Sequence, residues 1–555
     1  MSAALLELPF PIAGPMLPWR SIFAWFGLVP LLWAVLNPAT ADGKRPFRRA
    51  FLLSYLCGVL WYMGNCYWVR DTMLHYGDMP LGAPTLLLIA FSLVLGLYFG
   101  LFGLGLMIIR HATGNRRAAL IAAPFLWVAL DLAAARVTSV PWDQLGYSQV
   151  DNGVAIALAP WTGVYGISFI LIAANAVLLD LMTPGARESK GRTGRSVFGA
   201  QLVFAIAAAL LASGLGTNLY LRARAATSSA TAVLIQPNLD VAGDNDWSSA
   251  SDWQQHMAWL QKLASQQCKT YIAGIPQTGA ANGEVICPPY PTHPDLVVWP
   301  EAPALSFMEA DPRFQEGIAA LAREEQAPVI VGGYGVDISE SDNQRLDYNS
   351  AMVFAPDGHR VGRYDKIHLV PFGEYIPFQQ YLTFAHKLTG KVSSFSRGTE
   401  RSTFRLNGHR YGVFICYEAV FADEVRHFAQ LGAEVLVNIS DDGWYGDTSA
   451  PWQHLNMARM RAIENRRWLL RGTNNGVTAA IDPYGRVRQS IPRHQVDALP
   501  AQYGFRDDVT FYSAHGDIFA WLCVLISFAI LLWSLKKTIR NRVEVPSRVK
   551  PSQLR

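Results

Sequence analysis

The sequence predicts a multi-span α-helical membrane domain joined to a large water-soluble α/β domain. Of its 555 residues, 51% are hydrophobic and only 16% are charged, which is too apolar for a soluble protein of this length and too polar for a pure transporter. Long apolar runs gather in the first 225 residues and recur once near the C-terminus. Between them, residues 229–508 have an ordinary globular composition, which indicates a separate domain in water.

The apolar runs predict the spans, because a helix needs about 20 mainly apolar residues to cross the hydrocarbon core. Seven stretches qualify: 19–36, 50–69, 84–109, 118–135, 162–182, 197–216 and 516–535. The segment Ala3–Leu17 is a candidate for one more span at the extreme N-terminus, although it is short and holds three prolines. We therefore predict an N-terminal transmembrane domain over 1–225, a C-terminal transmembrane helix over 514–536 and a basic tail over 537–555.

The charges of the loops predict the orientation. Basic residues follow the first, third, fifth and last spans: Lys44, Arg45, Arg48, Arg49; Arg110, Arg116, Arg117; Arg187, Lys190, Arg192, Arg195; Lys536, Lys537, Arg540, Arg542, Arg548, Lys550 and Arg555. The loops between these positions are nearly neutral. Because Lys and Arg favour the cytoplasmic side, the soluble domain is expected outside the cytoplasm. The net charge of +4 is mild and gives no argument for nucleic-acid binding.

The soluble domain alternates predicted strands and helices. Short apolar runs bounded by turn residues predict strands at Ala232–Gln236, Leu296–Trp299, Val329–Gly333, Tyr411–Ile415 and Val435–Ile439. Phe421–Leu431 and His454–Trp468 have helical patterns. Repeated strand–helix units are typical of layered α/β domains.

Reactive side chains stand at three predicted strand ends, which is where α/β sheets build their sites. Glu301 follows one strand, Lys366 and Glu374 share one irregular segment, and Cys416 ends another strand. Taken one at a time, the cysteine is better explained as a small buried side chain, and the glutamates and the lysine as surface charges. Together, a thiol, a carboxylate and a cation are what nucleophilic acyl chemistry requires.

Two further function classes remain beside acyl transfer to another molecule. A membrane-tethered amidase that passes the acyl group to water would use the same Glu301, Lys366 and Cys416. A lipid-binding protein or transporter fits less well, because the trio is intact and the charged residues of the spans lie near span ends. None of the six cysteines forms a CxxC pair and no histidine lies at metal spacing, so we expect no metal and no organic cofactor.

Longer motifs make the prediction of the enzyme class more specific. They read WPE at 299–301, YDKIHLVPFGEYIP at 364–377, SSFSRG at 393–398, ICYE at 415–418, DGWYG at 442–446, PWQHLNMARMRAIE at 451–464, RGTNNGVTAAIDPYG at 471–485 and, in the membrane part, PWDQLGYSQVD at 141–151. Their set and order resemble the carbon–nitrogen hydrolase (nitrilase) superfamily and, within it, the apolipoprotein N-acyltransferase family. The resemblance covers nearly the whole chain. It implies a four-layer αββα sandwich over 229–508.

The resemblance also implies roles for individual residues. Cys416 would be the nucleophile that forms a thioester with a fatty acyl chain, and Glu301 the general base. Lys366, held by Glu374, would stabilise the oxyanion. Four more residues match supporting or substrate-binding positions, the last of them on a loop over the entrance: Tyr417, Glu418, Glu464 and Trp247.

The reaction implied by the resemblance joins two lipid substrates. A phospholipid such as phosphatidylethanolamine gives its sn-1 acyl chain to the cysteine, and the free α-amine of a diacylglyceryl-cysteine on an apolipoprotein receives it. The expected setting is the bacterial inner membrane, with the catalytic domain on the periplasmic side and a monomer as the default state. Asp441 stands where the family often has Asn, which leaves its role open. Outside the cytoplasm Cys268 and Cys287 are candidates for a disulfide, and two free thiols are an equal alternative.

Overall fold

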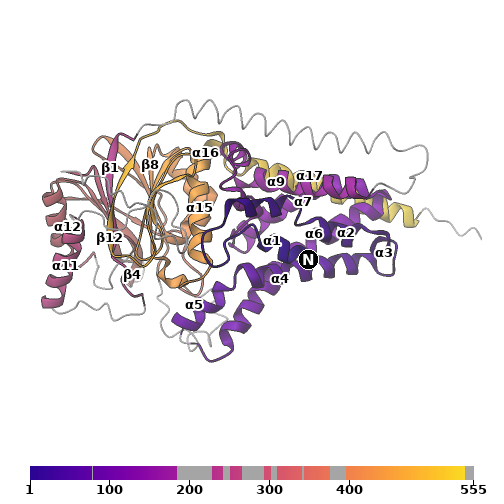
Figure 1. Ribbon diagram of the computed structural model, residues 1–555, viewed down its shortest axis with the longest axis horizontal. Helices are drawn as coiled ribbons and strands as arrows, with labels where there is room; N and C mark the ends of the chain where they lie inside the picture. Colours follow the sequence, from indigo (N-terminus) through magenta and orange to yellow (C-terminus); the bar gives the residue numbers. More distant parts are fainter. Residues whose placement is uncertain are drawn as a thin grey trace, which may run out of the picture.

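The protein has two parts that lie end to end, a bundle of long helices and an α/β domain (Figure 1). The computed structural model describes residues 1–77, 79–183, 228–241, 250–264, 293–301, 309–339, 343–375 and 395–543. The predicted span 197–216 lies outside these residues, as do Trp247, Cys268 and Cys287.

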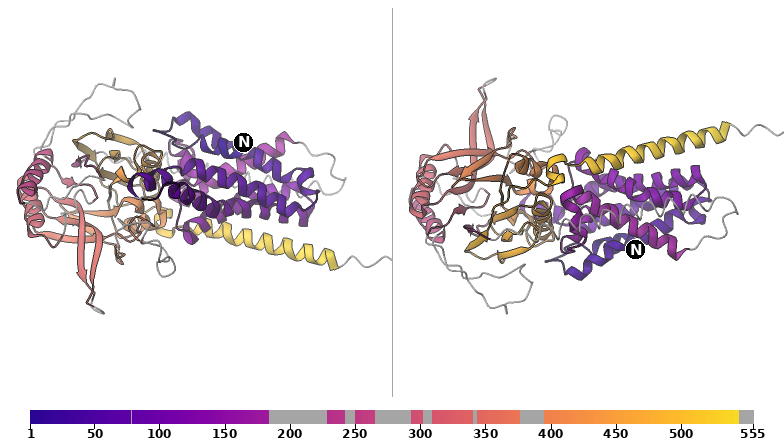
Figure 2. Two further views of the ribbon diagram at one scale, coloured as in Figure 1. Left: turned by 90° about the horizontal axis from the view of Figure 1, so that it is seen from below. Right: turned by 90° about the horizontal axis from the view of Figure 1, so that it is seen from above.

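The helical bundle holds most of the predicted spans. Its main elements are α1 (Ser2–Glu7), η1 (Pro18–Trp25), α2 (Val29–Leu36), α3 (Pro38–Ala41), α4 (Pro46–Asn65), α5 (Trp68–Tyr76), α6 (Ala83–Thr113), α7 (Arg116–Val137), α9 (Val164–Met182) and α17 (Ile518–Val543). Five helical segments of the described chain are long and apolar enough to cross a membrane: Pro18–Leu36, Ala83–Thr113, Arg116–Val137, Val164–Met182 and Ile518–Arg540. Figure 2 shows α17 running alongside the other helices of the bundle.

The structure differs from the predicted spans at two places. The predicted span 50–69 forms the helix α4, which is not among those five because Arg48, Arg49 and Asn65 make its ends polar. Its outward face is nevertheless apolar, with four leucines between 40% and 56% exposed: Leu52, Leu53, Leu56 and Leu60. The segment Ala3–Leu17 contains all but the first residue of α1, a helix of six residues whose length of about 9 Å is too short to cross a bilayer.

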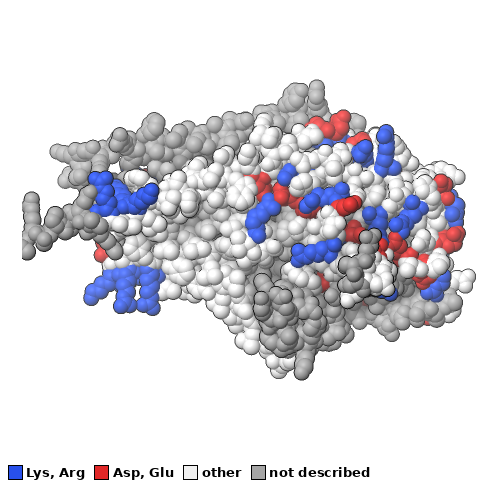
Figure 3. Space-filling view, turned by 180° about the vertical axis from the view of Figure 1, so that it is seen from behind, with Lys and Arg blue, Asp and Glu red and all other residues white. Residues whose placement is uncertain are grey.

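Basic side chains gather at the end of the bundle farthest from the α/β domain (Figure 3). Ion pairs join the loops there, since Arg110 lies 3.8 Å from Asp42. Arg116 and Arg117 lie 3.2 Å and 3.0 Å from Asp180. The opposite ends of these helices lie against the α/β domain (Figure 1). The loops after the first and third predicted spans thus lie on one side, as the charge pattern predicts.

Two six-stranded sheets form the centre of the α/β domain. The first has the order β12-β1-β2-β3-β4-β5 and the second β11-β10-β9-β8-β7-β6. The first comprises β1 (Ala230–Gln236), β2 (Leu296–Val298), β3 (Val329–Ile338), β4 (Arg345–Phe354), β5 (Arg360–Asp365) and β12 (Asp497–Tyr503). The second comprises β6 (Thr403–Leu406), β7 (His409–Ile415), β8 (Val435–Ser440), β9 (Trp468–Thr473), β10 (Thr478–Ile481) and β11 (Val487–Ile491). Strands β1–β3 and β7–β9 are parallel, and the outer strands pair antiparallel.

The two sheets pack face to face, with helices on both outer faces. Along β1, Val233 and Ile235 pack with the apolar side chains of α11 (Ala250–Ala264) and α12 (Pro312–Glu325). Leu234 between them packs with the core that includes the second sheet. The other face of that sheet carries α14 (Ala422–Gln430) and α15 (Ala450–Asn465), so the layers read αββα (Figure 1). The predicted four-layer sandwich is therefore confirmed.

All five predicted strands form, but the predicted helix 454–468 has different ends. Helix α15 starts at Ala450, and Trp468 opens β9. Arg466 adopts a left-handed conformation with φ 52°, which ends the helix at Asn465. The turn into β9 thus comes three residues earlier than the apolar pattern suggests.

The seam between the two parts is a hydrogen-bonded contact along α15 and the strand ends of the second sheet. Trp142 of the membrane domain donates its indole N–H to the Gln453 amide oxygen (2.8 Å). Gln453 in turn donates to the carbonyl oxygen of Asn65 (3.0 Å). The Tyr417 hydroxyl donates to the carbonyl oxygen of Ser139 (3.1 Å), so the membrane domain touches the residue that follows Cys416.

Candidate active site

Lys366 is buried between two carboxylates. It follows β5, Glu301 follows β2, and Glu374 lies eight residues further along the chain. The Lys366 Nζ lies 3.0 Å from Glu301 Oε1 and 2.9 Å from Glu374 Oε1, and only 1% of the lysine side chain is exposed. The structure thus brings together residues of two separate motifs, Glu301 from the first and Lys366 with Glu374 from the second.

Asn349 of β4 completes this cluster, and the sequence analysis missed it. Its side-chain Nδ2 donates to Glu301 Oε1 (2.7 Å) and to Glu374 Oε1 (2.6 Å). Its carbonyl oxygen accepts the backbone N–H of Lys366 (2.9 Å). One asparagine therefore fixes both carboxylates and the lysine, and the only sequence signal for it is a polar residue ahead of the apolar run Ser350–Phe354.

Cys416 stands at the end of β7 in a strained backbone conformation. Its φ of 47° lies in the left-handed region, which non-glycine residues rarely adopt, and its side chain is buried. Its carbonyl oxygen lies 2.9 Å from His454 Nε2. The other ring nitrogen, Nδ1, lies 2.9 Å from Asp442 Oδ1 and 3.1 Å from the Arg471 guanidinium, which donates to Asp442 (2.7 Å). Burial and Arg471 lower the pKa of His454, against the opposing effect of Asp442.

Electrostatics couple the thiol to the cluster. Burial and the Glu301 carboxylate raise the pKa of the Cys416 thiol well above its usual value, while the Lys366 ammonium acts against them. Burial alone would lower the pKa of Lys366, but Glu301 and Glu374 raise it well above its usual value. At neutral pH the thiol therefore keeps its proton and the lysine keeps its charge. Attack by this thiol requires a base, and the carboxylate that acts on it most strongly is Glu301.

Glu418 ties the nucleophile to the lysine segment. Its Oε2 accepts the backbone N–H of Ile415 (2.7 Å), and its Oε1 accepts that of Ile367 (2.7 Å). The hydroxyl of Tyr364 donates to the same Oε1 (2.8 Å). A buried carboxylate that accepts these donors from both sheets holds the strand ends of Cys416 and Lys366 at a fixed separation.

Asp441, at the end of β8, reaches the same cluster through its backbone. Its N–H donates to Glu301 Oε2 (2.9 Å), while its side chain accepts from the Gly443 N–H (3.0 Å) and the Asn474 amide (3.1 Å). Burial and the nearby Glu301 raise the pKa of Asp441 to about 8. The residue is therefore largely a neutral carboxylic acid at neutral pH.

Comparisons with known proteins match both parts of the chain. The family model described as Apolipoprotein N-acyltransferase N-terminal domain matches residues 2–177, and the model described as Carbon-nitrogen hydrolase matches residues 224–496. An apolipoprotein N-acyltransferase of Geobacter metallireducens is 33% identical over 94% of this chain and 92% of its own length. The chain belongs to the apolipoprotein N-acyltransferase family.

Further relatives agree with this assignment. The apolipoprotein N-acyltransferase of Azotobacter vinelandii is 31% identical over 96% of this chain and 94% of its own length. Among solved structures, Saccharomyces cerevisiae Nit3 of the nitrilase superfamily is 16% identical, covers 52% of this chain and 96% of its own, and gives a TM-score of 0.35. The family membership makes this protein an acyltransferase of lipoproteins, so the predicted enzyme class is confirmed over the tethered amidase.

Glu464 lies away from the Lys366 cluster of this acyltransferase, in the seam between its two parts. Its Oε1 accepts the backbone N–H of Val164 at the start of α9 (3.0 Å), where the helix dipole favours a carboxylate. Arg461 donates to the same oxygen (3.1 Å) and to the Tyr147 hydroxyl (2.9 Å). Burial raises the pKa of Glu464 to about 7, against the opposing effect of Arg461.

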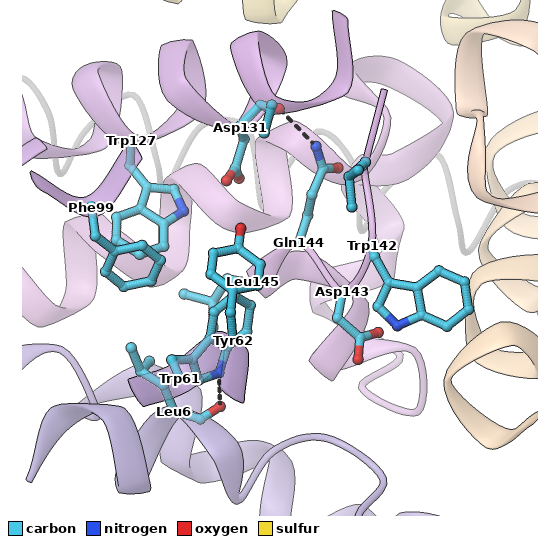
Figure 4. A pocket seen from close by; sticks show the side chains of 12 residues that line it. Leu6, Trp61, Tyr62, Phe99, Trp127, Asp131, Trp142, Asp143, Gln144 and Leu145 are labelled. Atoms are coloured by element: carbon cyan, nitrogen blue, oxygen red, sulfur yellow. Dashed lines mark hydrogen bonds between the residues drawn. The ribbon is translucent and has the colours of Figure 1, made fainter. Parts of the chain in front are cut away.

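A small cavity lies on the membrane side of the acyltransferase (Figure 4). Aromatic side chains of α4, α6 and α7 line it, together with loop residues after α7: Trp61, Tyr62, Phe99, Trp127, Trp142 and Asp143. Trp142 also stacks on Tyr417, with ring centroids 6.4 Å apart. The cavity and the segment of Cys416 therefore share one wall. Across the described ranges, no group of three His, Cys, Asp or Glu side chains is arranged to hold a metal ion.

Proposed function

We propose that this acyltransferase works by a ping-pong reaction through a thioester on Cys416. The donor is a phospholipid of the phosphatidylethanolamine type, which gives its sn-1 acyl chain. The acceptor is the free α-amine of the diacylglyceryl-cysteine of an apolipoprotein. The observation that carries this proposal is the buried Glu301–Lys366–Glu374 cluster beside a strained, protonated cysteine at the membrane seam.

In the first half-reaction the Cys416 sulfur attacks the ester carbonyl carbon, and its proton passes to Glu301. The negative oxygen that develops is stabilised by Lys366, which Glu374 and Asn349 hold in place, and by the backbone N–H of Tyr417. The carbon–oxygen bond then breaks, and Glu301 returns the proton to the leaving lysophospholipid.

The second half-reaction reverses these roles. The acceptor amine attacks the thioester carbon and loses a proton to Glu301, and the carbon–sulfur bond breaks. The departing Cys416 sulfur takes the proton back, which restores the resting thiol. Water competes for the thioester, so a site closed against the membrane domain favours transfer over hydrolysis.

The setting proposed for this reaction is the bacterial inner membrane, with the domain over 229–508 on the periplasmic side. The basic end of the bundle in Figure 3 supports this orientation, since Lys and Arg favour the cytoplasmic face. Tyr417 and Glu418 would support the nucleophile, Glu464 would fix the two parts to each other, and Trp247 would cover the entrance. The protein would act as a monomer, without a metal or organic cofactor.

Intact-protein mass spectrometry tests the proposal. We expect wild-type enzyme in detergent, incubated with phosphatidylethanolamine, to gain one hydroxylamine-labile acyl group that Cys416→Ala lacks. A diacylated lipopeptide with a free N-terminus should discharge that group, and an N-acetylated lipopeptide should not. An adduct that water discharges as fast as the lipopeptide does would overturn the transferase mechanism.

A further inference from the structure

Arg397 lies beside the catalytic cluster on a segment that is bonded to it twice. The Phe395 N–H donates to the carbonyl oxygen of Glu374 (3.0 Å). The Gly398 N–H donates to the carbonyl oxygen of Lys366 (2.9 Å). The intervening Arg397 is exposed, so its backbone is fixed against two catalytic residues while its side chain remains accessible.

The direction of this side chain follows from its contact with Tyr375. The guanidinium carbon lies 4.8 Å from the centre of the Tyr375 ring. Gly398, next to Arg397, bonds to Lys366, and the following Ile367 donates its N–H to Glu418 (2.7 Å). Tyr417, beside Glu418, bonds to Ser139 of the membrane domain. Arg397 is therefore joined through the Lys366 segment to the residues that meet the membrane domain.

Neighbouring arginines are paired with carboxylates. Arg401 lies 2.5 Å from Glu424, Arg426 lies 2.6 Å from Asp423, and Arg363 lies 2.8 Å from Asp365. Arg397 forms no ion pair with a carboxylate of the described chain. An exposed arginine beside the site, without an acidic partner among the described residues, is suited to an external anion, and its planar fork matches the oxygens of a phosphate.

We propose that Arg397 binds the phosphodiester of the phospholipid acyl donor and thereby sets the donor's sn-1 ester against Cys416. This inference rests on the proposed function, because it assigns the donor's headgroup to a residue of that same site. The phosphate is common to ethanolamine and glycerol headgroups, so Arg397 selects phosphodiester lipids as a class. The acyl chain itself is not its target.

The test compares two acyl donors that differ in the phosphate. Single-turnover formation of the acyl-enzyme is followed by mass spectrometry with phosphatidylethanolamine in mixed micelles and with p-nitrophenyl palmitate, which has no phosphate. We expect Arg397→Gln to slow the reaction of the phospholipid by about 10- to 100-fold, the range for a lost charged hydrogen bond. The nitrophenyl ester should react at the wild-type rate. Arg397→Lys should retain part of the phospholipid rate because it keeps the charge.

The matched control is Arg405→Gln, which removes an exposed arginine of β6 and should change neither rate. Equal slowing of both donors by Arg397→Gln would mean a structural role and would overturn the inference. So would an unchanged phospholipid rate, or a defect confined to discharge by the lipopeptide. Failure of the proposed function looks different, because wild-type enzyme would then form no acyl-enzyme from the phospholipid.

Discussion

Two buried ionic clusters in this protein have similar chemistry and different surroundings. In the catalytic cluster, Glu301, Glu374 and Asn349 hold Lys366 beside a thiol, and all of these contacts stay within the α/β domain. In the seam cluster, Glu464 and Arg461 bond to Val164 and Tyr147, which belong to the other part of the molecule.

The two clusters differ in the groups with which their carboxylates interact. The carboxylate of the seam cluster accepts a backbone N–H across a domain boundary. The carboxylate of the catalytic cluster acts electrostatically on a buried thiol whose backbone is strained. Burial and ion pairing therefore occur in both clusters, and the catalytic cluster differs by the thiol beside it.

The largest expected effect comes from Glu301→Gln. The glutamine keeps the shape and an acceptor for Lys366 but cannot take the thiol proton, so acyl-enzyme formation should fall by about 10²- to 10⁴-fold. Single-turnover mass spectrometry measures the rate, and unchanged thermal unfolding shows that the fold is intact. Glu464→Gln is the matched variant in the seam cluster and should react within about two-fold of wild type. Similar losses in both variants would remove the distinction between the clusters.

Asn349→Leu should have the next largest effect, about 10- to 100-fold on acyl-enzyme formation. Removing the amide takes one donor from each of Glu301 and Glu374, so both carboxylates lose the contact that they share. Single-turnover mass spectrometry measures the rate, and thermal unfolding measures the stability of the fold. A wild-type rate per folded molecule would indicate that Asn349 only supports the fold.

The catalytic cluster also shows how far sequence reasoning reaches. Glu301 and Cys416 could be proposed from the sequence because each stands at the end of a predicted apolar strand, and Lys366 because it shares a long motif with Glu374. Asn349 could not, since β4 begins with polar residues and was not predicted as a strand. Its contacts depend on the pairing of β4 with β5, which sets Asn349 against the segment that starts at Lys366.

The contacts of the seam between the two parts could not be predicted from the sequence either. Glu464 belongs to a motif, and only the packing of α15 on the bundle shows that it contacts α9 and lies apart from the thiol. The sequence analysis assigned no role to His454, whose ring lies 2.9 Å from the carbonyl oxygen of Cys416. Contacts between residues that are far apart in the chain set these roles, and the sequence pattern around each residue does not reveal them.

Glu464→Ala should mainly affect stability. It leaves Arg461 and the Val164 N–H without their buried acceptor, which should lower the free energy of unfolding by about 3 kcal/mol. Thermal unfolding in detergent measures the loss, while the acyl-enzyme rate per folded molecule should stay near that of wild type. Full stability combined with a lost rate would place Glu464 in the catalytic machinery instead.

Asp441→Asn should change how the stability of the protein depends on pH. The pKa of Asp441 is raised to about 8 in the folded protein, first by burial and then by Glu301. Between about pH 4 and about pH 8 the folded state therefore holds a proton that the unfolded state has released, so this group's contribution to stability falls as the pH rises. The variant has no such titration, and its Tm relative to wild type should increase from about pH 5 to about pH 9.

Asp357→Asn is the control for this measurement. Asp357 lies in an exposed turn where the backbone N–H of His359 lowers the pKa of its carboxyl group. This carboxylate is ionised in both states over the same pH range, so its Tm difference should stay flat. A flat difference for Asp441→Asn as well would mean that Asp441 releases its proton equally in the folded and unfolded states. The Glu301 carboxylate would then have an ionised neighbour, and the catalytic cluster would carry one more negative charge than it does with a protonated Asp441.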